Sequence, residues 1–161
     1  MKTQSESNEL NRIEKRAIEA SAIAPIIHAV AQRIGKEEAF AILQEVNEKE
    51  AFQRGESIRK KLGHTGIHEL VDDVATWGIG GELKMEVLEQ TSYTYHFNIT
   101  RCPYYEKYRE LELAEYGVAF SCCRDEPFAR GLHPQLKLER TQTIMEGADY
   151  CDFRYTLGSS R

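Results

Sequence analysis

The stretch SYTYHFNITR, residues 92–101, contains the clearest strand pattern of the chain. Aromatic and aliphatic side chains occupy every second position, at Tyr93, Tyr95, Phe97 and Ile99. Threonine, histidine and asparagine fill the positions between them, and strict alternation of this kind is typical of a strand with one buried face. Directly after the strand, Pro103 predicts a short helix over about 104–111, because proline fits the first helical turn.

We expect three other segments after residue 81 to belong to the same sheet. Residues 83–88 form a short candidate strand, and residues 135–145 and 150–156 alternate again, with a turn at Gly147 between them. We therefore expect the last two segments to pair as a hairpin. A further short helix is expected over 113–121.

The part before residue 81 has the spacing of helices instead. Apolar residues recur at intervals of three and four over about 9–34, 36–62 and 66–77, and the glycine-rich run 78–81 ends the pattern. Asn8 is the expected N-cap of the first helix, and Pro25 is expected to kink or divide it. Gly55 is a possible interruption of the second helix.

Helices followed by strands indicate an α+β fold: N-terminal helices, then a mainly antiparallel sheet with short helical insertions. We expect one domain over 1–161, with a helical part at 1–80 and a sheet part at 81–157 that carries the motifs. No linker composition divides the two parts.

Composition excludes several classes of function. The 161 residues carry 21 Lys and Arg against 26 Asp and Glu, a formal net charge of −5, and this acidity argues against a nucleic-acid partner. No apolar run approaches the roughly 20 residues of a membrane span, and the polar N-terminus lacks the apolar core of a signal peptide. We expect a cytoplasmic protein whose four cysteines are reduced.

Cys102 is the first candidate for chemistry. It stands where the strand ends and the next helix begins, so its thiol would lie near a helix N-terminus and beside Arg101. Both neighbours favour the thiolate and predict a lowered pKa. The alternative is a small residue packed at the end of a strand.

The segment SCCRDEP, residues 121–127, brings two thiols close to a carboxylate. Asp125 could orient a thiol, act as a general base or bind a metal. The spacing matches no standard zinc pattern, and the chain has no C-x-x-C. The alternative is a polar loop with one buried cysteine.

The segment 139–155 contains the last candidates. Counting by twos puts Cys151 on one face with Phe153 and Tyr155, and places Arg154 on the other face. If the faces of the two strands align, Cys151 lies near Thr141 and Thr143, whereas Arg140 and Arg154 point away from it. The alternative is that all of these residues only pack, since threonine and tyrosine are good strand formers.

Two segments, FNITRCPYYEKYRELELAEYG (97–117) and SCCRDEPFARGLHPQLKLERTQTIMEGADYCDFRY (121–155), resemble the L-2-amino-thiazoline-4-carboxylate hydrolase family. The resemblance implies hydrolysis of a carbon–nitrogen or carbon–sulfur bond in a small cyclic amidine or thiazoline that carries a carboxylate. Opening such a ring needs a nucleophile, a proton donor and an anchor for the carboxylate.

The resemblance suggests residues for each role. Cys102, Cys122 and Cys151 are candidate nucleophiles, with Cys122 preferred over its neighbour Cys123, and Asp125 and Glu146 are candidate acid–base groups. Candidate substrate-binding residues are Arg101, Arg140, Thr141, Thr143, Glu146 and Arg154.

Two chemistries and one further class of function stay open. In the first chemistry a thiolate attacks the ring; in the second, the thiols and Asp125 hold a divalent metal such as zinc, which activates water. If Cys102, Cys122, Asp125 and Cys151 all bind, they saturate a tetrahedral zinc, and a structural role for the metal is then expected. The non-enzymatic alternative is a small-molecule- or metal-binding domain similar to 4-vinyl reductase domains. The partner is a small molecule in each case, and a homo-oligomer is a further possibility that the sequence leaves open.

Overall fold

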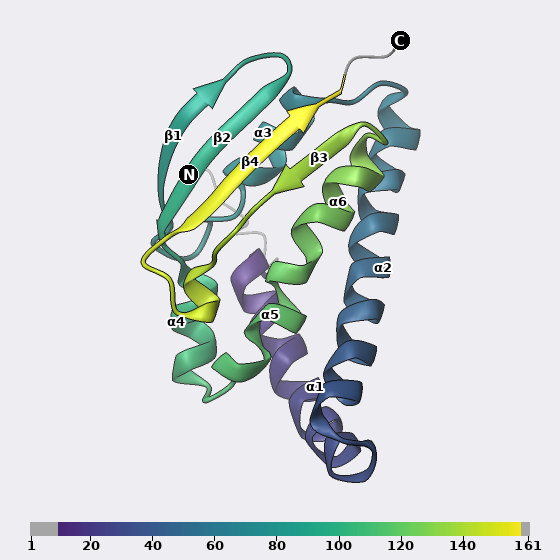
Figure 1. Ribbon diagram of the computed structural model, residues 1–161, viewed down its shortest axis with the longest axis vertical. Coiled ribbons are helices and arrows are strands. Elements are labelled where there is room, and N and C mark those ends of the chain that lie inside the picture. The colour runs from purple at the N-terminus through teal and green to yellow at the C-terminus, as the bar shows by residue number, and fades with distance from the viewer. Residues whose placement is uncertain (1–9, 159–161) are drawn as a thin grey trace, which may run out of the picture.

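In the computed structural model, which describes residues 10–158, a four-stranded sheet lies against a layer of helices (Figure 1). The strands are β1 (Lys84–Gln90), β2 (Thr94–Arg101), β3 (Leu136–Glu139) and β4 (Cys151–Leu157). They pair in the order β1-β2-β4-β3, and every pair is antiparallel. The expected α+β class, with helices first and an antiparallel sheet second, is confirmed.

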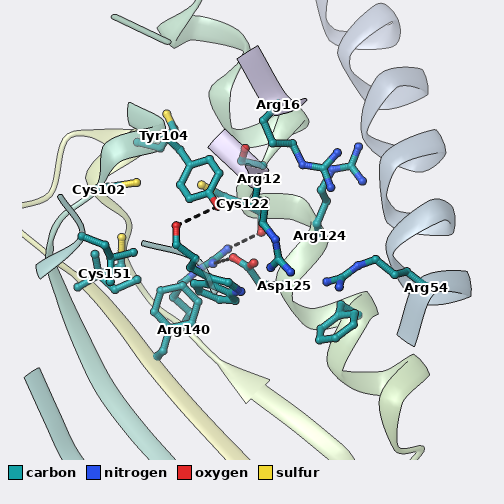
Figure 2. Close-up of a pocket in the computed structure, with 17 residues that line it drawn as sticks. Arg12, Arg16, Arg54, Cys102, Tyr104, Cys122, Arg124, Asp125, Arg140 and Cys151 are labelled. Atoms are coloured by element: carbon teal, nitrogen blue, oxygen red, sulfur yellow. Dashed lines mark hydrogen bonds and ion pairs between the residues drawn. The ribbon is translucent and has the colours of Figure 1, made fainter. Parts of the chain in front are cut away.

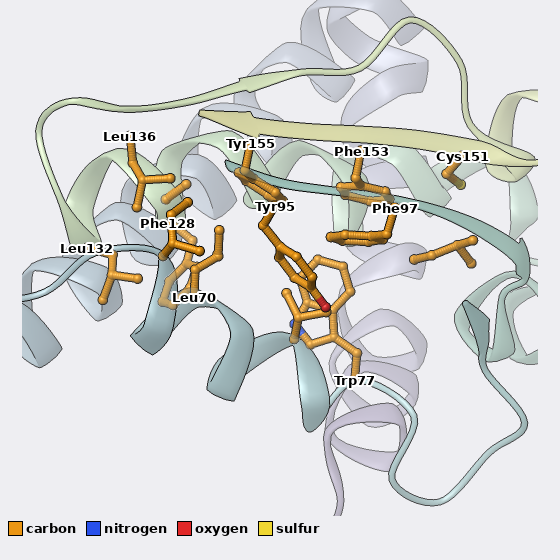
Figure 3. Packing of buried hydrophobic residues seen from close by; sticks show 14 of the residues in the cluster. Leu70, Trp77, Tyr95, Phe97, Phe128, Leu132, Leu136, Cys151, Phe153 and Tyr155 are labelled. Carbon is orange, nitrogen blue, oxygen red and sulfur yellow. The ribbon is translucent and has the colours of Figure 1, made fainter. Parts of the chain in front are cut away.

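The core lies on the face of the sheet that the alternation of β2 predicts. Tyr95, Phe97 and Ile99 are buried, and they pair in register with Tyr155, Phe153 and Cys151 of β4. The Phe97 and Phe153 rings stack with their centroids 4.8 Å apart. The Trp77 and Phe153 rings are tilted by 65° with their centroids 5.6 Å apart, so this aromatic cluster joins the end of the helical part to the sheet (Figure 3).

The three long segments before the sheet are helical, as expected: α1 (Arg12–Ile34), α2 (Lys36–Leu62) and α3 (Ile67–Ala75). The expected cap Asn8 lies outside the described residues; α1 is capped by Asn11, which forms a capping box with Glu14. The helix is not divided at Pro25. This proline lies on the exposed side of α1, while Ala24 and Ile27 are buried and hold the helix against its neighbours.

Gly55 does not interrupt α2 either; it lets α2 pack closely on α6 (Asp125–Leu132). A Cβ atom at Gly55 would overlap the carbonyl oxygen of Phe128, and one at Gly131 would overlap the carbonyl oxygen of Phe52. The two glycines therefore allow the two backbones to approach.

Short helices connect the strands. Helix α4 (Pro103–Glu110) has Pro103 in its first turn, as predicted. The segment expected as one helix over 113–121 is two pieces, η1 (Ala114–Tyr116) and α5 (Gly117–Phe120), and η2 (Cys122–Arg124) leads from them into α6. None of the helices in residues 10–158 combines the length and apolar character needed to cross a bilayer.

The expectation of a long strand over 135–145 is wrong. β3 ends at Glu139, and the chain then leaves the sheet and forms the short helix η3 (Ile144–Glu146) before the turn at Gly147. Thr143 caps η3 by accepting a hydrogen bond from the Glu146 amide, so its side chain is used in a turn rather than in a ladder. The predicted pairing of this segment with β4 holds only for the four residues of β3.

Candidate functional site

A pocket that is open to solvent lies between the helices and the buried face of the sheet. Its apolar walls are Trp77, Leu83, Ile99, Phe128, Met145 and Phe153. Its polar lining contains three thiols, five arginines, Tyr104, Ser121 and one carboxylate, that of Asp125 (Figure 2). A largely apolar cleft with a few converging polar groups is the usual form of a small-molecule site.

Three cysteines from separate parts of the chain converge there. Cys102 is the N-cap residue of α4, Cys122 opens η2, and Cys151 is the first residue of β4. The thiol of Cys151 accepts a hydrogen bond from the Ile144 amide at 3.2 Å. Cys123 is not among the lining residues, because its thiol donates to the Ala119 carbonyl oxygen one helical turn back.

The lowered pKa expected for Cys102 is wrong. Burial raises the pKa of this thiol to about 11, and the backbone amides of Tyr105 and Tyr104 at the helix N-terminus oppose that rise without cancelling it. Arg101 does not help, because it is turned outward and pairs with Glu106 at 2.7 Å and with Glu82. Burial also raises the pKa of the other two pocket thiols, most strongly that of Cys122.

Asp125 and Arg140 form an ion pair in the middle of the pocket. The Arg140 Nη1 lies 2.6 Å from Asp125 Oδ2, and its Nη2 donates to the Cys122 carbonyl oxygen at 2.9 Å. Burial raises the pKa of the Asp125 carboxyl, and the charge of Arg140 opposes that rise. A carboxylate with a raised pKa is a better general base near neutral pH than an exposed one.

Counting by twos along a strand predicted that Arg140 points away from Cys151. This prediction does not apply, because β3 ends at Glu139, one residue before Arg140. Its guanidinium instead lies 5.0 Å from the centre of the Phe153 ring and lines the pocket. The same parity is correct for Arg154, which lies on β4 and donates to the carbonyl oxygens of Phe97 and Phe153 outside the pocket lining.

The remaining candidates stabilise the segment between β3 and β4 and do not line the pocket. Thr141 donates to Asp152 at 2.6 Å, and Thr143 donates to Glu146 at 2.7 Å. None of Thr141, Thr143 and Glu146 lines the pocket, and their hydrogen bonds are satisfied locally. The expected polar cluster of the two threonines around Cys151 is therefore not formed.

Sequence reasoning missed the charged residues that the helical part contributes. Arg12 of α1 and Arg54 of α2 both line the pocket and share the carboxylate of Asp73 on α3, at 3.0 and 2.8 Å. Burial raises the pKa of Asp73, but the hydrogen bonds from the two guanidinium groups prevail and leave it at about 2. The only signal in the sequence was the spacing of Arg12 and Arg16, which places them on one face of a helix.

The same helical part contributes Arg16, and η2 contributes Arg124, so five arginines line the pocket, and their ion-pair partners are the four carboxylates of Asp73, Asp125, Glu19 and Glu50. The remaining positive charge suits a ligand with an anionic group. A metal has no comparable support, since within residues 10–158 no three His, Cys, Asp or Glu side chains are grouped so that they could hold an ion.

Known structures share the fold. The phenol-responsive sensory domain of the transcription activator PoxR aligns with a TM-score of 0.54 at 10% identity, over 86% of this chain and 74% of that one. A trafficking protein particle complex subunit 3 from Naegleria fowleri, solved covalently bound to palmitic acid, aligns with a TM-score of 0.51 at 11% identity, over 90% and 96%. At these identities the likeness concerns the fold alone.

No curated protein matches the chain. The family of L-2-amino-thiazoline-4-carboxylic acid hydrolases, in contrast, matches residues 15–155, which include both the helical part and the sheet with the pocket between them. The chain belongs to this family.

Proposed function

We propose that the protein is a hydrolase that opens a small heterocyclic ring of the cyclic amidine or thiazoline type, by cleavage of a carbon–nitrogen or carbon–sulfur bond. One observation carries the proposal beyond the family match: three separated blocks of sequence bring Cys102, Cys122 and Cys151 into one pocket with the Asp125–Arg140 pair. The apolar walls suit a small ring, and the arginines suit its carboxylate.

The reaction starts with attack on the ring carbon that lies between nitrogen and sulfur. Cys122 is the nucleophile, because Arg140 contacts both its backbone and the carboxylate of Asp125. The Cys122 pKa is well above its usual range, so the thiol needs a base, and Asp125 takes its proton as the sulfur–carbon bond forms.

The ring then opens. The bond from that carbon to ring sulfur or nitrogen breaks, and Asp125 returns the proton to the leaving atom. Water adds to the same carbon with Asp125 again as the base, and Cys122 leaves as the thiol. The net change is the addition of one water to the ring.

The cysteine doublet supplies a matched test. We expect Cys122→Ser to abolish most of the turnover of 2-amino-thiazoline-4-carboxylate, measured by chromatography of the opened product. Cys123→Ser should stay near the wild-type rate, because the Cys123 thiol lies outside the pocket lining and donates a hydrogen bond to the Ala119 carbonyl oxygen. Equal rates for the two variants would remove Cys122 from the mechanism, and absence of turnover by the wild-type protein would refute the hydrolase.

An unreactive binding domain is the second candidate. It is favoured by the shared fold with a sensory domain that responds to phenol and by the aromatic wall of Trp77 and Phe153. Calorimetry with the same ring compound separates the two: stoichiometric binding with no product after prolonged incubation indicates the binding domain.

A further inference from the structure

Arg16 and Arg124 form a pair of like charges at one end of the pocket. Arg16 lies in the first turns of α1 and Arg124 at the end of η2, and both side chains line the pocket. They are largely buried, with 16% and 11% of their side-chain surface exposed. Figure 2 shows them on the side of the pocket opposite Cys102 and Cys151.

Their partners distinguish these two arginines from the other three. Arg140 pairs with Asp125, and Arg12 and Arg54 share Asp73; both carboxylates are largely buried. Arg16 pairs with Glu19 and Arg124 with Glu50, and these glutamates are 44% and 52% exposed. The charges of Arg16 and Arg124 are therefore compensated from the solvent side.

Arg16 uses few of its N–H donors within residues 10–158. A guanidinium offers five N–H groups, and among residues 10–158 the acceptor of Arg16 is the Glu19 carboxylate. Arg124 is held more firmly, because it also donates to the Phe120 carbonyl oxygen at 2.7 Å and to the side chain of Asn47. Arg124 is thus a fixed group, while Arg16 offers unused donors to a ligand.

The two guanidinium groups are close enough to oppose each other. Burial and then the neighbouring charge of Arg16 lower the pKa of Arg124. Two like charges in a poorly hydrated site are unfavourable unless an anion lies between them. A carboxylate there would accept charge-assisted hydrogen bonds from Arg16 and relieve the repulsion.

We infer that Arg16 and Arg124 form an anion subsite that takes the carboxylate of the ligand and turns its ring toward Asp125 and the thiols. The identity of the ligand as a ring acid rests on the proposed function; the anion subsite rests on the two arginines. This assignment replaces Arg101 and Arg154, which lie outside the pocket lining, as the carboxylate anchor.

The test compares an acid with its neutral analogue. With turnover suppressed by Cys122→Ser in every protein compared, the otherwise wild-type chain should bind 2-amino-thiazoline-4-carboxylate about 10- to 100-fold more tightly than the corresponding carboxamide, as measured by calorimetry. Arg16→Met should reduce that preference to a few-fold or less. Arg33→Met, an exposed arginine on the same helix, is the matched control and should keep the full preference. If Arg16→Met does not fold, Arg16→Lys keeps a charge but loses the planar fork, and it should lose most of the preference.

The outcomes separate the subsite from the hydrolase. An Arg16-dependent preference for the acid without turnover supports the subsite and refutes the hydrolase. Turnover with a preference for the acid that Arg16→Met leaves unchanged overturns the subsite alone.

If neither ring compound binds, the proposed function fails, and a measurement with sulfate then tests the subsite by itself. Sulfate should raise the unfolding temperature more than chloride does at equal ionic strength in wild type but not in Arg16→Met. Equal effects of the two salts in wild type would overturn the subsite.

Discussion

Burial controls the reactivity of the pocket thiols. Cys102 occupies a helix N-cap, a position that usually favours the thiolate, yet its pKa is raised from 9.0 to about 11. Two pKa units correspond to a thiolate fraction about 100-fold smaller at neutral pH. We therefore expect Cys102 in the folded protein to react with iodoacetamide at least about 100-fold more slowly at pH 7 than in the urea-unfolded chain.

The pH profile separates this electrostatic effect from simple shielding. The rate for folded Cys102 should still rise about tenfold per pH unit at pH 9.5, where the rate of an unfolded thiol levels off, because the thiolate fraction grows up to the pKa. Mass spectrometry of the peptide containing Cys102 gives both rates. A folded-state rate that levels off near pH 9 would contradict the raised pKa.

Residue types in the sequence indicated part of the pocket lining. Thiols and a carboxylate in three blocks pointed to Cys102, Cys122, Asp125 and Cys151, and all four line the pocket. The choice of arginines was poorer, because Arg101 adjoins Cys102 in sequence but turns to Glu106 in space. Neither the direction of a side chain at the end of a strand nor the burial that raises a thiol pKa follows from residue order.

Asp73 joins the first three helices. Its carboxylate binds Arg12 of α1 and Arg54 of α2, and it accepts from the Trp77 indole at 3.0 Å. Its pKa is lowered from 3.8 to about 2, so its contribution to stability is present above about pH 4 and is lost as the pH falls toward 2. The shift corresponds to about 2 kcal/mol.

Asp73→Asn should therefore lower the free energy of unfolding by about 2 kcal/mol at pH 7, and the difference from wild type should shrink as the pH approaches 2. Urea denaturation at several pH values measures both. Asp72→Asn, at an exposed position of the same helix, is the control and should change little. A pH-independent difference for Asp73→Asn would show that its effect does not come from ionisation.

The contact of α2 with α6 depends on two glycines. Gly131→Ala would place a Cβ against the backbone of Phe52, and overpacking of this kind costs about 1–3 kcal/mol. The higher helix propensity of alanine returns at most about 1 kcal/mol, so we expect net destabilisation. Gly158→Ala is the control, since its Cβ would lie at ordinary contact distance from Gln135. A lower urea midpoint for Gly131→Ala alone is the expected result, and equal midpoints would contradict the close packing.

The elements were predictable where burial has a simple period. β2 alternates because one face packs on Trp77 and the other does not, so its pattern was visible in the sequence. Residues 140–145 also alternate, but there the polar side chains stabilise turns. Thr141 donates a hydrogen bond to the Asp152 carboxylate, and Thr143 caps η3. A threonine in a cap and one in a strand look the same in sequence, which explains why the strand was predicted too long.

At the scale of the whole molecule, the pocket belongs to both parts of the chain. The helical part, which lacks cysteine and shows no sharp motif, supplies Arg12, Arg16 and Arg54, while the sheet part supplies the thiols and the Asp125–Arg140 pair. The lining residues are spread along the chain from Arg12 to Phe153, so no local pattern could reveal that they meet in one pocket. The helices are therefore part of the site and more than a support for the sheet.

Ligand binding should accordingly protect both parts at once. A ring acid at 100 times its dissociation constant would stabilise the folded state by about 2.7 kcal/mol, and groups that contact it should show the largest local slowing of hydrogen exchange. With 2-amino-thiazoline-4-carboxylate we expect protection in the first half of α1 as well as in η2 and the start of β4, measured by mass spectrometry. β1 is the internal control, since it lies at the exposed edge of the sheet and contributes no lining residue. Protection confined to residues 97–155 would mean that the helices do not bind the ligand.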